Sequence, residues 1–195
     1  MKIIDITQEI LSCKVFPGDP KPKGNRILSM EKGDYCNCST LFMCAHNGTH
    51  VDAPYHFIND GKTIDKLPLD VFVGKAYVYR HDGIVTKNDA LSIIEQAKAL
   101  NASERILIAG KATVSEEAAS AFAEANVKLV GNESQTVGPE DGPIPVHKIL
   151  LGAGISLLEG VRLDGVTTGK YFLSAAPLNF SGFEGSPCRA YLIKE

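Results

Sequence analysis

Residues 46–56 read His46-Asn47-Gly48-Thr49-His50-Val51-Asp52-Ala53-Pro54-Tyr55-His56, and they hold three of the chain's five histidines with an aspartate among them. Imidazole nitrogens and carboxylate oxygens are ligands of Zn²⁺ and related divalent metal ions. In an extended segment, His50 and Asp52 point to the same face because they are two residues apart. His46 can fold back towards that face, since Gly48 permits a tight turn. The stretch therefore predicts a metal site.

His56 closes this stretch, and Pro54 stiffens the chain just before it. This arrangement places His56 beside the predicted cluster without requiring it to bind metal. The alternative is a polar loop in which the histidines are only hydrogen-bonded. Buried, clustered histidines need a common partner, which favours the metal site over that alternative.

The composition is that of an ordinary globular protein. The 195 residues suit a single domain over residues 1–195, with 44% apolar and 22% charged residues. The formal net charge of −3, without a long basic run, argues against nucleic acid or a membrane as a partner. The start does not resemble a signal peptide, and the five irregularly placed cysteines are typical of reduced thiols, so we expect a cytoplasmic protein. The pair Cys36-x-Cys38 is interpreted as packed or half-exposed thiols rather than metal ligands.

Apolar patterning predicts alternating strands and helices in the middle of the chain. Thr86 is a candidate N-cap for a helix that runs to about Leu100, and a second helix is expected from Ser115 to Asn126. Alternation of this kind argues for an α/β fold. Strands are expected near residues 3–6, 40–44, 75–80, 105–109, 127–130, 155–158, 170–175 and 188–193, and the Pro- and Gly-rich residues 131–145 are expected to form a loop.

His147 and Glu159 form a second candidate pair after that loop. On local sequence alone, a capping histidine and a solvated glutamate at a strand end are the simpler interpretation. Phe16 heads a turn-rich stretch and is either a loop anchor or an aromatic wall of a substrate pocket. The residues themselves leave these alternatives open.

The motif resembles that of the metal-dependent cyclase family, whose best-known members are bacterial kynurenine formamidases. Its H-x-G-T-H-x-D-x-P-x-H pattern is matched at His46, Gly48, Thr49, His50, Asp52, Pro54 and His56. Residues 5–7, 16–19, 155–163 and 187–190 also resemble segments of the family. His147 and Glu159 keep the twelve-residue interval of the family's metal-binding His and Glu. The resemblance therefore covers most of the chain, in patches.

This resemblance implies an α/β, layered β/β/α fold with a central barrel-like sheet and flanking helices, usually as a homodimer. It implies that His46, His50 and Asp52 bind a first metal ion, and that Asp52 can bridge to a second site completed by His147 and Glu159. His56 would be the catalytic acid–base. Zn²⁺ is the expected ion, Mn²⁺ and Fe²⁺ suit the same ligands, and one or two ions per chain are compatible with these residues.

Several positions depart from the kynurenine formamidase pattern. Glu133 stands where an aspartate is usual, Gly138 where a second acidic residue is common, and residues 109–111 replace an Arg-Thr-Gly-like passage. Phe16 takes a position often held by a larger aromatic residue, in a chain without Trp. These departures affect the metal chemistry less than the assignment of an aryl formamide substrate.

The sequence predicts a metal-dependent hydrolase that cleaves the C–N bond of a small amide, formamide or cyclic amide. A bound divalent cation would activate water, and His56 would move a proton from that water to the leaving nitrogen. An iron-dependent oxygenase using His50, Asp52 and His147 is an alternative, but it leaves His46 and His56 without a role. A catalytically inactive metal-binding homologue is the third interpretation.

Overall fold

Strand β7 (Arg105–Ala109) is buried along its whole length and runs through the middle of the protein. Its side chains alternate between two apolar layers, with Ile106 and Ile108 on one face and Leu107 and Ala109 on the other. Burial on both faces is typical of a strand that lies between two packed layers. The structure, a computed structural model, describes residues 1–194.

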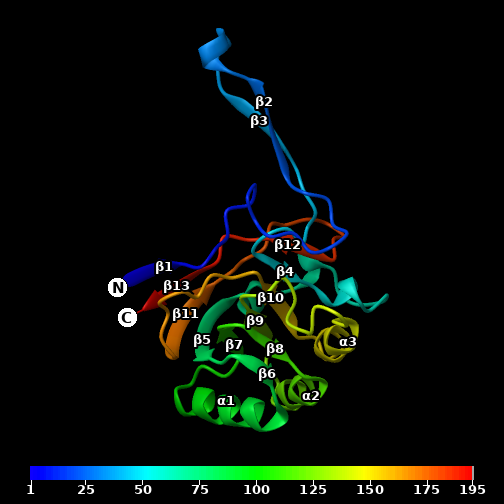
Figure 1. Ribbon diagram of the computed structural model, residues 1–195, viewed down its shortest axis with the longest axis vertical. Coiled ribbons are helices and arrows are strands. Elements are labelled where there is room, and N and C mark those ends of the chain that lie inside the picture. Colours follow the sequence, from blue (N-terminus) through cyan, green and yellow to red (C-terminus); the bar gives the residue numbers. More distant parts are fainter. Residues whose placement is uncertain (195) are drawn as a thin grey trace.

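A curled nine-stranded sheet carries β7 at its centre (Figure 1). In spatial order its strands are β1 (Lys2–Asp5), β13 (Tyr191–Lys194), β11 (Gly169–Ser174), β5 (Val73–Arg80), β7, β9 (Leu129–Asn132), β10 (Ser156–Glu159), β4 (His50–Asp52) and β12 (Gly185–Pro187). The strands β5, β7, β9 and β10 are parallel, whereas β4 pairs with β10 and β12 in antiparallel fashion. The pairing of β1 with β13 brings the two ends of the described chain side by side (Figure 1).

Three helices connect the parallel strands and cover one face of the sheet (Figure 1). They are α1 (Lys87–Ala99), α2 (Glu116–Glu124) and α3 (Ile144–Gly152). Their buried apolar residues form one core cluster with Ile106 and Ile108, and a second cluster fills the opposite face. This arrangement confirms the predicted α/β fold with a barrel-like sheet. None of the helices within residues 1–194 is long and apolar enough to cross a membrane.

The two predicted helix starts are confirmed by their caps. Thr86 and Asp89 form a capping box, in which each side chain accepts a hydrogen bond from the other residue's backbone N–H. Ser115 caps α2 by accepting a hydrogen bond from the backbone N–H of Ala118 at 3.2 Å. Asn126 follows α2 with a φ of 55°, the left-handed conformation that asparagine tolerates at a helix end.

A hairpin of β2 (Lys23–Leu28) and β3 (Cys38–Phe42) projects away from the sheet, and we call residues 23–42 the arm (Figure 1). The strand predicted at residues 40–44 is therefore an exposed arm strand, with Leu41 and Phe42 58% and 61% exposed. The remaining strands, β6 (Gly83–Val85) and β8 (Ala112–Val114), form a separate parallel pair.

Other boundaries differ from the sequence predictions. The loop predicted at residues 131–145 overlaps the end of β9 and the start of α3, because Pro143 and Pro145 stand at the start of the helix, where proline is tolerated. His147 therefore lies in a helix rather than after a loop. The strand expected at residues 188–193 begins only at Tyr191, as β13, and residues 188–190 link it to β12.

Candidate metal centre and active site

The motif residues occupy a turn followed by a short strand. Gly48 has a φ of 68°, the left-handed conformation that favours glycine, and it reverses the chain between His46 and His50. The next residue is held in place by two hydrogen bonds, because Thr49 Oγ1 donates to Gly160 O at 2.7 Å and accepts from Gln8 N at 2.9 Å. The chain then enters β4, where side chains alternate between the two faces.

Strand pairing brings the second predicted pair to this strand. In the antiparallel register of β10 with β4, Glu159 lies opposite His50 and Leu157 lies opposite Asp52. Val51, between the two motif residues, points into the apolar core instead. The face of β4 that carries His50 and Asp52 therefore also receives the carboxylate of Glu159.

Asp52 lies at the centre of the cluster. Its Oδ1 is 2.9 Å from His46 Nδ1 and 3.5 Å from His50 Nε2, and its Oδ2 is 3.9 Å from His147 Nε2. Glu159 places Oε2 at 3.5 Å from His50 Nε2 and Oε1 at 3.2 Å from His147 Nε2. The structure thus brings all five predicted metal residues together in two groups that share Asp52: His46, His50 and Asp52, and Asp52, His147 and Glu159.

The residues of the cluster are taken out of water, with His50, Asp52, His147 and Glu159 each 3% exposed or less. Burial lowers the pKa of His46, but the carboxylates of Asp52 and Glu184 outweigh burial and raise that pKa to about 11. Burial also lowers the pKa of His147, but the Glu159 carboxylate outweighs burial and raises that pKa to about 9. Without a bound cation, the positive charge of protonated histidines therefore compensates the negative charge of the buried carboxylates.

The cluster fits a divalent cation. Among residues 1–194, Asp52 Oδ2 is buried and has no hydrogen-bond partner. A buried carboxylate oxygen in this situation is unfavourable unless a cation or a donor satisfies it. Three imidazoles and two carboxylates are a donor set that suits Zn²⁺, Mn²⁺ or Fe²⁺.

His56 lies beside the cluster and belongs to neither group. It ends the 3₁₀ turn Pro54–His56, which follows β4. Its ring stacks on that of His46, with centroids 4.1 Å apart and planes inclined by 26°. Burial lowers the pKa of His56 below its ordinary value, so the ring is neutral near pH 7 and able to accept a proton.

A cavity of about 450 Å³ opens beside His56 and is lined by Tyr55, His56, Phe57, Asn59 and Glu184. Phe57 packs against two histidines of the site, with ring centroids 4.4 Å from His56 and 4.9 Å from His147. Phe16, the predicted substrate contact, is half-buried in its turn and is not among the residues that line this cavity.

Glu184 is a site residue that the sequence analysis missed. Its Oε1 lies 3.2 Å from His46 Nε2, and it immediately precedes β12. Only the pairing of β12 with β4, which sets Gly185 opposite Asp52, brings it to the cluster. The local sequence carries no signal of that pairing. Phe57 directly follows the motif and could have been identified from its position.

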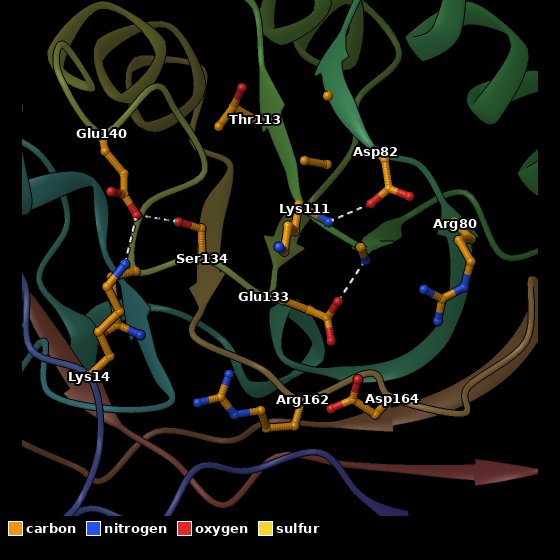
Figure 2. Close-up of a pocket in the computed structure, with 14 residues that line it drawn as sticks. Lys14, Arg80, Asp82, Lys111, Thr113, Glu133, Ser134, Glu140, Arg162 and Asp164 are labelled. Carbon is orange, nitrogen blue, oxygen red and sulfur yellow. Dashed lines mark hydrogen bonds and ion pairs between the residues drawn. The ribbon is translucent and has the colours of Figure 1, made fainter.

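Glu133, one of the departures from the family pattern, belongs to neither metal group and lines a larger cavity of about 970 Å³. Its carboxylate accepts hydrogen bonds from the backbone N–H groups of Gly110 and Leu163, both at 2.6 Å. Figure 2 shows it among Arg80, Lys111 and Arg162. Glu133 therefore links three segments of the chain, which is a structural role.

Gly138, another departure, packs against the start of α3. A Cβ at this position would lie 3.2 Å from Pro143 Cα and from Val146 Cβ. Such contacts are tighter than ordinary van der Waals contacts, so an acidic side chain would require α3 to shift. The glycine therefore suits the position of the helix that carries His147.

Comparisons with known proteins agree with this architecture. The family described as putative cyclase matches residues 4–139. A kynurenine formamidase from Salinibacter ruber is 33% identical over 210 residues, covering 98% of this chain and 97% of the relative. A solved structure of a potential metal-dependent hydrolase with cyclase activity is 30% identical, with a TM-score of 0.80 over 98% of this chain and 96% of the other. Isatin hydrolase A from Labrenzia aggregata shares the fold at 24% identity, with a TM-score of 0.82 over 100% of this chain and 94% of the other.

The family match covers more than half of the chain, and the curated relative aligns along nearly all of it. The region matched to the family contains the whole motif from His46 to His56. The chain belongs to the cyclase family, as the motif predicted, and is a hydrolase of amide C–N bonds other than peptide bonds.

Proposed function

We propose that this protein is a metal-dependent hydrolase of small formamides, with an aryl formamide as the preferred substrate. The observation that carries the proposal is the sharing of Asp52 by two groups of candidate ligands, with the His56 ring stacked beside them and belonging to neither. The name of the Salinibacter relative, kynurenine formamidase, supports the formamide class.

In this proposal, His46, His50 and Asp52 hold one cation, and Asp52, His147 and Glu159 hold a second. Zn²⁺ is the proposed ion, and Mn²⁺ or Fe²⁺ would suit the same donors. When bound, such a cation lowers the pKa of water and polarises the carbonyl group under attack. The buried Asp52 carboxylate, with both oxygens turned towards histidines, sets the distance between the two groups.

His56 is the proposed general acid–base. It takes a proton from the attacking water as the C–O bond forms, and it delivers that proton to the nitrogen as the C–N bond breaks. The products are formate and an amine, so no oxidant or reductant is needed. Its pKa, lowered by burial, keeps the imidazole neutral before the reaction.

The cavity beside His56 is where we place the substrate. Tyr55 and Phe57 give it aromatic walls that suit an aryl group, and Asn59 can hydrogen-bond a polar substituent. Phe16 stays a proposed substrate contact on the family resemblance alone, since it is half-buried but does not line this cavity. We therefore expect aryl formamides to be better substrates than formamides without an aromatic ring.

The test uses zinc-loaded protein and an aryl formamide such as N-formylkynurenine, with released formate as the readout. His56→Ala is expected to keep its zinc, and its kcat is expected to fall by about 10²–10⁴-fold. His50→Ala is expected to lose zinc and activity together. His81→Ala is the matched control, because that ring is half-buried, lies outside both metal groups and hydrogen-bonds only to Ile84 O in the described chain.

Three results would contradict the proposal. Equal zinc loss in the His50 and His56 variants would remove the division of roles. Zinc-loaded protein without turnover on aryl formamides or cyclic amides would favour an inactive homologue. Oxygen consumption with Fe²⁺, in the absence of hydrolysis, would identify an oxygenase that uses His50, Asp52 and His147.

We further infer that the chain works as a homodimer through its arm. An isolated two-stranded hairpin is marginally stable in water, yet the arm projects from the body with Ile27, Leu41 and Phe42 all more than half exposed (Figure 1). A cavity of about 830 Å³ lies at the base of the arm, lined by Leu41 and Phe42 together with Phe180 and Phe183 from the body. A second copy would cover both surfaces at once, which is the self-complementary contact of a two-fold dimer.

We also propose that the protein works in a reducing cytoplasm. All five cysteines are free thiols, and no pair of them forms a disulfide in the described residues. Burial raises the pKa of the Cys188 thiol to about 12, which keeps it protonated and unreactive.

A further inference from the structure

Two of the three histidines in the proposed metal groups are oriented by backbone carbonyls. His50 Nδ1 donates a hydrogen bond to Gly48 O at 3.0 Å, and His147 Nδ1 donates one to Pro143 O at 2.8 Å. Because a carbonyl oxygen only accepts, each Nδ1 carries a hydrogen and each Nε2 is left to face the carboxylates. An outer acceptor of this kind fixes the tautomer and the ring orientation of a metal-binding histidine.

His46 is turned the other way. Its Nδ1 faces the cluster at 2.9 Å from Asp52 Oδ1, and its Nε2 faces outward at 3.2 Å from Glu184 Oε1. Glu184 is therefore the outer hydrogen-bond acceptor of His46, as Gly48 O is for His50 and Pro143 O is for His147. It is the one acceptor of the three that is a side chain, and it can be removed by mutation.

The fold holds Glu184 in this place. Its carbonyl oxygen accepts a hydrogen bond from Ala53 N at 2.8 Å, next to the end of β4. The following Gly185 packs against the imidazole so closely that a Cβ there would lie 2.8 Å from His46 Cε1. The ring of His56 stacks on the same imidazole. The position of the His46 ring is therefore set by Gly185 and His56, and the direction of its Nε2 by Glu184.

We propose that Glu184 is the positioning residue of the metal centre, an inference that rests on the proposed function. Its carboxylate accepts the Nε2–H of His46, so that the lone pair of Nδ1 is presented to the group formed with His50 and Asp52. Carboxylate acceptors behind metal-binding histidines also raise the basicity of the ring. Glu184 acts through His46, although its side chain also reaches the cavity beside His56.

The experiment measures Zn²⁺ affinity by chelator competition and the ¹⁵N spectrum of the zinc-loaded imidazoles. Glu184→Ala is expected to weaken Zn²⁺ binding by about 10- to 100-fold and to shift the His46 Nε2–H signal to that of an imidazole N–H without a carboxylate acceptor. Glu184→Gln keeps an acceptor oxygen without the charge, so it is expected to restore part of the affinity and the hydrogen bond on the His46 Nε2–H. Asn59→Ala is the matched control for Zn²⁺ affinity and should leave that affinity at the wild-type value, because Asn59 lines the same cavity but is not a candidate metal ligand.

Glu184→Ala protein with Zn²⁺ affinity within twofold of wild type, or with an unshifted His46 Nε2–H signal, would overturn the inference. Equal loss in Glu184→Ala and Asn59→Ala would also overturn it, since general damage to the cavity would then explain the effect. Neither readout depends on turnover. Wild-type protein that binds Zn²⁺ through His46 but hydrolyses no amide would refute the proposed function alone, and wild-type protein that binds no Zn²⁺ would refute both.

Discussion

Glu159 lies directly opposite His50 in the pairing of β10 with β4, and its Oε2 is 3.5 Å from His50 Nε2. This relationship joins two parts of the chain that are far apart in sequence. Because Asp52 projects from the same face of β4, the two carboxylates meet between the histidines of both groups. The proposed centre therefore depends on the register of two short strands as much as on the motif itself.

Zn²⁺ binding should release protons and weaken at low pH. The pKa of His46 is raised to about 11 and that of His147 to about 9, so both rings are protonated at pH 7 when no cation is bound. A metal ligand must be unprotonated, and each displaced proton lowers the apparent affinity by about tenfold for every unit that the pH falls. Calorimetry in two buffers of different ionisation enthalpy counts the protons. Binding at pH 7 without proton release would contradict the raised pKa values.

Gly185→Ala should disturb the centre although it replaces none of the proposed ligands. The added Cβ would lie 2.8 Å from His46 Cε1 and 2.9 Å from Val51 O, so the ring or the strand must move. Overpacking of this kind costs about 1–3 kcal/mol in free energy of unfolding. We expect this loss together with weaker Zn²⁺ binding, measured by denaturant unfolding and chelator competition. Gly142→Ala is the control, since nothing lies within 4 Å of a Cβ there.

Glu133→Gln should lower stability and leave metal binding unchanged. The carboxylate accepts one hydrogen bond on each oxygen, from Gly110 N and Leu163 N, whereas glutamine offers one acceptor oxygen. Loss of a hydrogen bond to a charged group costs about 1.5–3 kcal/mol in free energy of unfolding. Asp164→Asn, in the same cavity, provides the control. A drop in bound zinc in the Glu133 variant would show that its role is not only structural.

Replacement of Leu41 and Phe42 by serine should convert a dimer into a monomer. Both side chains are exposed on the arm and line the cavity at its base, so they would be buried by a second copy. Light scattering after size exclusion measures the mass of each variant. Leu69→Ser, at an exposed apolar residue outside the arm, should leave the mass unchanged. A wild-type protein that is already monomeric at micromolar concentration would contradict the dimer.

The sequence predicted the local part of the site well. The two-residue spacing of His50 and Asp52 and the glycine turn before them depend only on nearby backbone geometry, and the structure has both. The helix starts at Thr86 and Ser115 were predictable for the same reason, because a cap is a contact within one turn. Features that depend on contacts between residues close in sequence were thus identified from the residues alone.

Long-range contacts were the part that could not be predicted. Glu184 reaches His46 only because β12 pairs with β4. Neither residue spacing nor composition predicts that pairing. The helix that carries His147 was missed because the prolines at its start also suit a loop. The arm was missed because an apolar run such as residues 40–44 normally indicates burial, whereas here the strand is exposed.

The most direct test of the shared role of Asp52 is the zinc content of purified protein, compared between wild type and a His147→Ala/Glu159→Ala double variant. Elemental analysis gives the number of equivalents per chain. Two equivalents in wild type and one in the double variant are the predicted result, because His46, His50 and Asp52 remain as a complete group. One equivalent in both proteins would confine the metal to the motif and contradict a centre in which Asp52 joins two ions.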